Sequence, residues 1–391
     1  MITVSDENGG AFNVATSGSG AVGIVAQSIA GNGGAVFTSS NLSDVTVTAQ
    51  TSPSNGKSGG LNVNLDASTI STTGNYAPGL FLQSGNALFT VFAADGQQTY
   101  RQAQSLPIAN VQTLNSFSLG ADSTIQTSGT QSHGLVMETY SYYGSTGAPS
   151  KGGIDRSLNM WVDGNITVSG ADSWGVMAGN TWDVSSTFTI PHPNNVTTAF
   201  TLGDNAKITA QTGTAGGIKL YDTGNLLANI NGIIDAGTGT AIDISAANTF
   251  LTVGDATAYI GSQLYYGDID VTATAAGGTN TITFNDSSIL YGGITSDTSV
   301  GAKSDITVYG RIQNVGGDAI SLGTLGAAGS AVTVYQAFGD IKASSNPYGF
   351  TASLTNQSGI WGNISGPFDY HINAGAIHTL DVAAGPAVAP G

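Results

Sequence analysis

The sequence predicts an all-β protein folded as a right-handed parallel β-helix, a solenoid with loop insertions. Three observations favour this class. Short runs of alternating apolar and polar residues recur along the chain. Glycine is abundant, at 56 of 391 residues, and it separates these runs together with Asn and Asp. A two-strand unit then repeats from one end of the chain to the other.

The alternating runs are four to six residues long and rich in Val, Ile and Thr, as strands are. No stretch with a helical period of 3.6 residues competes with them. The acidic residues are almost all Asp, which favours turns, whereas Glu would favour helices. We therefore expect strands at 44–49, 61–65, 165–169, 268–273, 281–284, 305–309 and 331–335.

The two-strand unit consists of a strand, a small turn near Gly, and a strand that starts with Gly or Ala followed by Ile, Leu or Val. The starting positions are 56, 55, 41, 42 and 24 residues apart, near multiples of about 20 to 28 residues, which is the length of one or two coils of a solenoid. Short strands without crossover helices also build sandwiches and barrels, but recurrence along the whole chain favours the β-helix. These starting positions are Gly23, Gly79, Gly134, Gly175, Gly217 and Ala241.

Two stretches interrupt the repeat, and we interpret them as insertions near 89–119 and 139–157 in a single β-helical domain that spans 1–381. In repeat proteins such insertions lie on one face, often the binding face. Residues 382–391 are a Pro/Ala/Gly tail without a period, typical of a linker.

Charge and composition exclude several classes of function. The formal net charge is -16, with 9 Lys and Arg against 25 Asp and Glu, so nucleic acid and anionic membranes are not expected partners. The absence of Cys excludes disulfides, thiolate metal sites and cysteine nucleophiles. No run reaches the ~18 apolar residues of a membrane span. Residues 1–7 lack a basic region and an apolar region, so no signal peptide is expected.

One segment carries a family resemblance. GIVAQSIAGNGG at 23–34 resembles the Gly-Ile-x-Ala-Gln-Ser-Ile-Gly-Gly-Gly-Gly repeat of bacterial autotransporter passenger domains, and PGLFLQS at 78–84 and HGLVMETY at 133–140 resemble degenerate copies. The resemblance implies a β-helical passenger outside the outer membrane that serves adhesion, aggregation or biofilm formation. It also implies anchoring through an outer-membrane barrel, which this sequence lacks, and the chain keeps one clear copy of the repeat.

The most promising recognition cluster combines aromatic and basic side chains in the second insertion. Rigid aromatic residues in loops contact ligands at a low cost in entropy. The expected ligand is a cell-surface, matrix or polysaccharide partner, or another copy of the chain. The alternative is that these aromatic residues only cover the core, and the same ambiguity applies to Trp161, Trp174, Trp182, Tyr265 and Tyr266. The candidate ligand-binding residues are Tyr140, Tyr142, Tyr143, Lys151 and Arg156.

Catalysis is the more remote of two alternatives, considered because many β-helices degrade polysaccharides. Glycosidases need two carboxylates about 5 to 10 Å apart, and Asp268 and Asp270 share a strand face. Alternating Asp on an exposed strand also simply solubilises it, and we prefer that interpretation. The arginines lie in no recognisable motif, and the nonapeptide calcium pattern is missing. We expect structural histidines at 133, 192, 371 and 378, and no catalytic residue, metal or cofactor.

A self-assembling filament is the leading alternative, since the bare strand edges at the ends of a β-helix pair with another copy unless they are blocked. Among these alternatives, the sequence favours a non-catalytic protein of the cell surface or extracellular space that binds or scaffolds.

Overall fold

The computed structural model describes residues 12–30, 34–38, 61–86, 88–93, 98–102, 113–143, 156–184, 197–222, 224–256, 263–345, 347 and 349–373. These residues form strands joined by turns, so the described part of the chain is all-β, as predicted. It contains no helix long and apolar enough to span a membrane. The chain divides into two compact units, Met1–Asn225 and Leu226–Gly391, which are described separately below.

Some of the sequence predictions fall on other parts of the chain. The segments and residues that lie outside the described residues are positions 31–33 of the motif segment, the expected strand at 44–49, the parts of the first insertion at 94–97 and 103–112, the part of the second insertion at 144–155, His192, His378 and the tail at 382–391.

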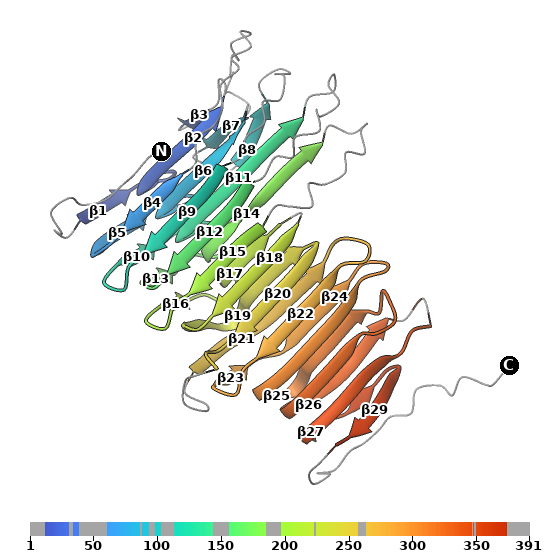
Figure 1. The fold of residues 1–391 in the computed structure, drawn as a ribbon. Helices are drawn as coiled ribbons and strands as arrows, with labels where there is room; N and C mark the ends of the chain where they lie inside the picture. The colour runs from blue at the N-terminus through green and yellow to red at the C-terminus, as the bar shows by residue number, and fades with distance from the viewer. Residues whose placement is uncertain are drawn as a thin grey trace. The chain divides into compact units, whose positions relative to one another are not determined.

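Unit 1 consists mainly of three stacks of parallel strands, each paired in register with the next (Figure 1). This parallel stacking is compatible with the expected β-solenoid. The first stack is β1 (Phe12–Ser17), β5 (Ser68–Thr73), β10 (Thr124–Thr127), β13 (Asn165–Val168) and β16 (Lys207–Ala210). The second is β2 (Ile24–Ala30), β6 (Leu80–Asn86), β11 (Leu135–Tyr143), β14 (Trp174–Val184) and β17 (Gly216–Tyr221). The third is β4 (Asn62–Leu65), β9 (Thr113–Leu119), β12 (Arg156–Val162) and β15 (Thr197–Leu202).

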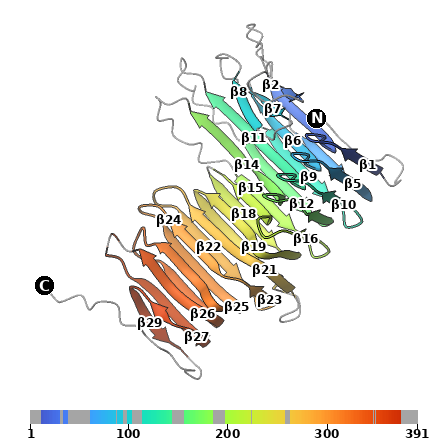
Figure 2. The same cartoon turned by 180° about the vertical axis from the view of Figure 1, so that it is seen from behind.

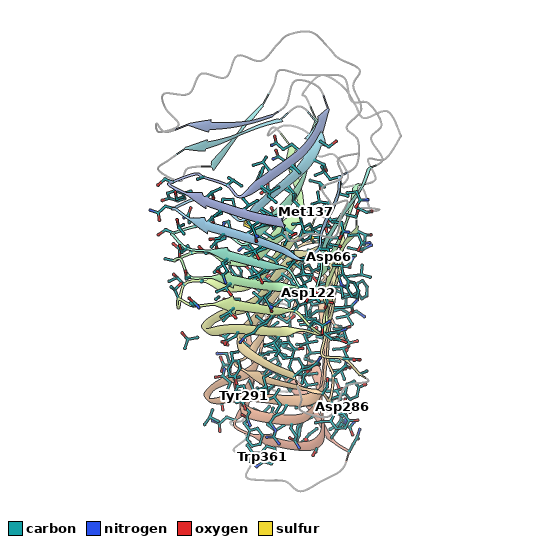
Figure 3. All side chains as sticks on the ribbon, turned by 90° about the vertical axis from the view of Figure 1, so that its left-hand side faces the viewer. Asp66, Asp122, Met137, Asp286, Tyr291 and Trp361 are labelled. Atoms are coloured by element: carbon teal, nitrogen blue, oxygen red, sulfur yellow. The ribbon has the colours of Figure 1, made fainter. Side chains whose placement is uncertain are left out.

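Each stack buries every second side chain, so identical or similar apolar residues form ladders inside the unit. In the first stack the ladder consists of isoleucines at 70, 125, 166 and 208, all fully buried. In the second, Met137 lies between Leu82 and Ala178 in the buried interior (Figure 3). The alternation seen in the sequence thus corresponds to inward and outward positions on parallel strands.

The predicted glycine anchors stack directly upon one another at the entrance to the second stack. A Cβ on Gly23, Gly79, Gly134 or Gly175 would lie 2.5–2.8 Å from the carbonyl oxygen of the next anchor glycine. It would also meet the γ2 methyl group of a ladder isoleucine in the first stack. These positions therefore need glycine because backbone and isoleucine approach closely, not because of a left-handed φ.

The spacing of successive layers differs from the prediction in unit 1. Gly23 lies on Gly79 and Gly134 on Gly175, so each of these long separations corresponds to one layer and not to two coils. Part of the extra length forms a separate three-stranded sheet in which β3 (Gly34–Thr38) pairs in parallel with β7 (Leu88–Ala93), and β7 in antiparallel with β8 (Gln98–Gln102). The end of the expected insertion at 89–119 is strand β9 of the third stack.

Unit 2 also consists of three parallel stacks, but single long strands pass from one stack into another (Figure 2). Register shifts within β19, β25 and β26 mark these passages. The strands are β18 (Asn225–Ile230), β19 (Ile233–Ala246), β20 (Asn248–Val253), β21 (Gln263–Ala273), β22 (Thr279–Phe284), β23 (Ser288–Tyr291), β24 (Ile294–Thr298), β25 (Lys303–Thr324), β26 (Ala331–Ser345), β27 (Ala352–Trp361), β28 (Ile364–Ser365) and β29 (Phe368–Ile372).

The core of unit 2 contains an isoleucine ladder with one residue from each of six successive strand segments. Its members are the isoleucines at 242, 269, 294, 320, 341 and 364, which follow one another at short and nearly regular intervals. The layer length in this unit therefore agrees with the prediction of about 20 to 28 residues per coil. The outward positions between these buried residues hold the side chains that a ligand could reach.

Candidate functional site

The structure places the predicted recognition residues as follows. Tyr140, Tyr142 and Tyr143 lie in the second half of strand β11, in register with β14, and Arg156 is the first residue of β12. Lys151 lies outside the described residues. The tyrosines are thus on an extended parallel strand pair, and the structure describes the backbone of this segment only.

Close to these tyrosines, the polar positions of the autotransporter-like motif form a row across the second stack. Gln27, Gln83 and Glu138 are in register, and Gln27 Nε2 donates to Gln83 Oε1 at 2.9 Å. The Tyr221 hydroxyl donates to Glu138 Oε1 at 3.3 Å across Gly179, whose missing side chain leaves room for the tyrosine ring. Burial and the Glu138 carboxylate raise the pKa of Tyr221, which keeps this hydroxyl a donor. Gln83 and Glu138 are buried, and the two hydrogen bonds link strands of the stack from either end of the row.

His133, at the start of the degenerate motif copy, has a structural role. Its Nδ1 accepts a hydrogen bond from the backbone N–H of Trp174 at 3.0 Å. Burial and the positive charge of Lys219 lower its pKa from 6.5 to about 4, so the imidazole is neutral at pH 7. The Lys219 ammonium lies 5.1 Å from the centre of a Trp174 ring, which fixes this corner of the stack.

The carboxylates considered for catalysis lie on β21. Asp268 Oδ1 accepts a hydrogen bond from the backbone N–H of Gly293 at 2.8 Å, so this carboxylate holds the next layer in place. Asp270 is half-buried and in register with Asp243 on β19. Burial raises the pKa of Asp270, repulsion by Asp268 and Asp243 adds to the rise, and a hydrogen bond with Thr295 opposes it. The hydrogen bonds of Asp268 and Asp270 thus link successive layers, whereas the neighbouring carboxylates repel one another.

The most distinctive surface of unit 2 consists of two neighbouring rows of outward side chains. In one row Tyr266 stacks on Tyr291, with ring centres 4.9 Å apart and planes 8° apart. The row continues through Gln313, which is in register with Phe338, to Trp361. Figure 3 labels Tyr291 and Trp361 on the ribbon of this unit. Phe338 and Trp361 stack with ring centres 4.3 Å apart and planes 3° apart.

Arg311 lies in the second of these two rows, and its side chain contacts residues of both rows. Its Nε donates to Gln336 Oε1 at 3.0 Å, and its guanidinium carbon lies 5.6 Å from the centre of the Phe338 ring. Gly359 is in register with Gln336, and a Cβ there would lie 2.6 Å from the Trp361 indole. The glycine therefore makes room for the indole that completes the stack.

Two exposed tyrosines lie at the bend between stacks, next to Arg311 and Gln336 along their strands. Tyr309 is 46% exposed and Tyr335 37%, and their ring centres are 5.3 Å apart with planes inclined by 43°. Both side chains are therefore accessible to a ligand. We use the name aromatic–arginine surface for the set formed by Tyr309, Arg311, Tyr335, Gln336, Phe338 and Trp361.

Sequence reasoning missed this surface and, apart from Tyr266, the stacked row beside it. The aromatic residues of the surface stand alone in the sequence, whereas the prediction favoured the clustered tyrosines at 140, 142 and 143. One signal could have found it. In each stacked pair the second ring follows the first by about 25 residues, which is one layer of unit 2. Aromatic residues that recur at the repeat length therefore indicate this surface, and the pairs are Tyr266 with Tyr291, Tyr309 with Tyr335, and Phe338 with Trp361.

Within the described residues, no group of three or more His, Asp or Glu side chains is arranged to hold a metal ion. Comparison with known proteins gave no match to a family model, to a curated protein or to a solved structure.

Proposed function

We propose that the protein is a right-handed parallel β-helix of the autotransporter-passenger type, displayed outside the cell, that serves adhesion, aggregation or biofilm scaffolding and is not a catalyst. In this proposal an outer-membrane barrel outside this sequence anchors it. The aromatic–arginine surface is the single observation that carries the binding function, because it exposes aromatic and guanidinium groups on rigid, stacked strands. Many weak contacts along such a surface give firm attachment.

The motif copies support the passenger part of the proposal. Residues 24–30 of the segment that resembles the passenger repeat pair with the strand of the copy at 78–84, which in turn pairs with the strand of the copy at 133–140, so that Ile24, Leu80 and Leu135 are in register. The three similar segments therefore occupy equivalent positions in successive layers, as repeats of a solenoid do.

The test is to display the chain on a non-adherent bacterial strain through a surface anchor. We expect cells that carry it to aggregate, to form more biofilm, or to adhere to host cells or matrix more than cells carrying the anchor alone. Incubation of the purified chain with polysaccharides should release no new reducing ends or unsaturated products. Unchanged adherence, aggregation and biofilm mass at verified surface display would overturn the proposal.

A further inference from the structure

We propose that the aromatic–arginine surface binds a polysaccharide whose sugars carry carboxylate groups. Arg311 would pair with a sugar carboxylate while Tyr309 and Tyr335 pack against sugar rings. This inference rests on the proposed binding function and names its ligand class.

The unpaired charge of Arg311 is the first argument. Within the described residues, its interactions are with two neutral groups, the Gln336 amide and the Phe338 ring. Its terminal amino groups are not used by these contacts, so the guanidinium can present a fork of donors to a carboxylate. By contrast, Lys342 in the same unit forms an ion pair with Asp318. A cation that has no carboxylate partner in the described part of the chain, although the net charge is -16, fits an anionic ligand group.

Pre-organisation of the guanidinium is the second argument. The hydrogen bond from Nε to Gln336 fixes one edge of the guanidinium plane, and the Phe338 ring supports it. Phe338 is itself held by Trp361, and Gly359 makes the room for that indole. A side chain that is already ordered loses less entropy when it binds a ligand.

The third argument is the shape and chemistry of the flanking tyrosines. Tyr309 and Tyr335 combine an apolar ring face with a hydroxyl, as a sugar combines apolar C–H faces with hydroxyls. The two tyrosines come from adjacent strands, which are ~4.8 Å apart, close to the length of one sugar unit in a linear chain. Successive sugars can therefore meet successive rings, and this repeat favours a polysaccharide over a folded acidic protein.

The experiment measures binding of the purified full chain to polygalacturonate oligosaccharides by calorimetry over a series of salt concentrations. The matched probe is the methyl ester of the same oligosaccharides, which keeps the sugar backbone and removes the charge. We expect the ester to bind at least about tenfold more weakly, because it lacks the charge-assisted hydrogen bonds. Arg311→Gln should weaken binding of the acid to a similar degree and leave binding of the ester unchanged.

Three further variants separate charge, geometry and ring contacts. Arg311→Lys should recover only part of the affinity, since a lysine keeps the charge without the planar fork. Tyr309→Ala with Tyr335→Ala should weaken binding of both the acid and the ester. Lys303→Gln, which removes an exposed cation on the same strand outside this surface, should leave binding unchanged. The near-UV circular dichroism of each variant verifies that the fold is intact.

Equal binding of acid and ester, or an intact affinity after Arg311→Gln, would overturn the inference. Binding to neither oligosaccharide would also overturn it. Binding to polyglutamate that depends on Arg311, with none to polygalacturonate, would replace it by an acidic protein ligand. If displayed chains promote adherence but bind neither saccharide, the ligand class is wrong and the proposed function stands. If they bind the acid but promote no adherence, aggregation or biofilm, the proposed function fails instead.

Discussion

At the scale of single residues, the anchor glycines show how steric demand produces a sequence pattern. Each anchor lies so close to the next glycine carbonyl and to an isoleucine methyl group that no side chain fits. The recurring two-strand unit identified these glycines in the sequence. Their reason could not be predicted, because it depends on the distance between stacked strands that are far apart in the chain.

Replacing Gly134 with Ala should therefore destabilise the protein, because the new Cβ would lie 2.6 Å from the Gly175 carbonyl oxygen and would clash with Ile166. We expect a loss of about 1–3 kcal/mol in the free energy of unfolding, measured by urea denaturation. Gly20→Ala is the matched control. Its φ is +72° with open space around it, so only the backbone cost of ~1 kcal/mol applies. Equal losses for the two variants would contradict the steric explanation.

His133 makes the stability of the protein depend on pH. Its folded pKa of about 4 lies below the unfolded value of 6.5, so between these values the unfolded chain binds more protons. The free energy of unfolding should therefore fall by up to about 3 kcal/mol as the pH is lowered from 6.5 through 4. His133→Asn, which keeps an acceptor for the Trp174 N–H, should show a flatter profile in acid urea titrations. Parallel profiles for the two proteins would refute this.

Asp270 changes the pH dependence of stability in the opposite direction to His133. Its pKa is raised in the folded state, so its charged form destabilises the fold at neutral pH, and the penalty disappears as acid protonates the carboxylate. Asp270→Asn should raise the free energy of unfolding at pH 7, and this advantage should vanish at low pH. Asp305→Asn, at an exposed position of β25, serves as the control and should change stability far less. A variant that is less stable than the parent at pH 7 would show that the carboxylate is needed in its charged form.

At the scale of elements, side-chain hydrogen bonds at the corners hold successive strands together. Ser132 Oγ accepts from the buried N–H of Ala77 at 3.1 Å and donates to the Gly74 carbonyl at 2.6 Å. Ser173 continues this arrangement, because its Oγ accepts from the N–H of Ser132 at 2.9 Å. The serines satisfy backbone groups that the strand ladders leave unpaired at the bends.

Ser132→Ala should leave the Ala77 N–H buried without an acceptor, at a cost of about 1–3 kcal/mol in the free energy of unfolding. The control is Ser118→Ala, which removes a hydrogen bond to Asn64 on the exposed face and should cost less than ~0.5 kcal/mol. Denaturation of both variants in urea measures the difference. A similar small loss for both would mean that the corner serine is not needed for stacking.

The strands themselves were largely predictable, since an alternating pattern identifies a strand from local sequence alone. Strands β21, β22, β25 and β26 include the expected runs, and β4 and β13 cover all but one residue of the runs expected at 61–65 and 165–169. The outward rows were not predictable, because they depend on which strands are in register. Bulges within β25 and β26 shift that register between Val308 and Arg311, and again before Asp318. The neighbourhood of Arg311, Gln336 and Phe338 results from these shifts, which no local signal in the sequence marks.

At the scale of the whole molecule, the composition explains why binding would concentrate on few residues. Charged side chains make up only 9% of the sequence, and there are 9 cations among 391 residues. Most outward positions hold Ser, Thr or Asn, which give a solvated but weakly interacting surface. The exposed tyrosines and Arg311 differ from this background, and large aromatic and arginine side chains contribute most to binding energy in general.

The central claim is that the aromatic–arginine surface attaches the protein to its ligand. The most direct test compares the adherence to biofilm matrix of beads coated with equal amounts of the parent chain, of Arg311→Gln with Tyr309→Ala and Tyr335→Ala, or of Lys303→Gln. We expect the triple variant to lose about 90% of adherence, a tenfold effect, and the lysine control to retain it. Full adherence by a folded triple variant would contradict the claim and would place the binding surface elsewhere on the chain.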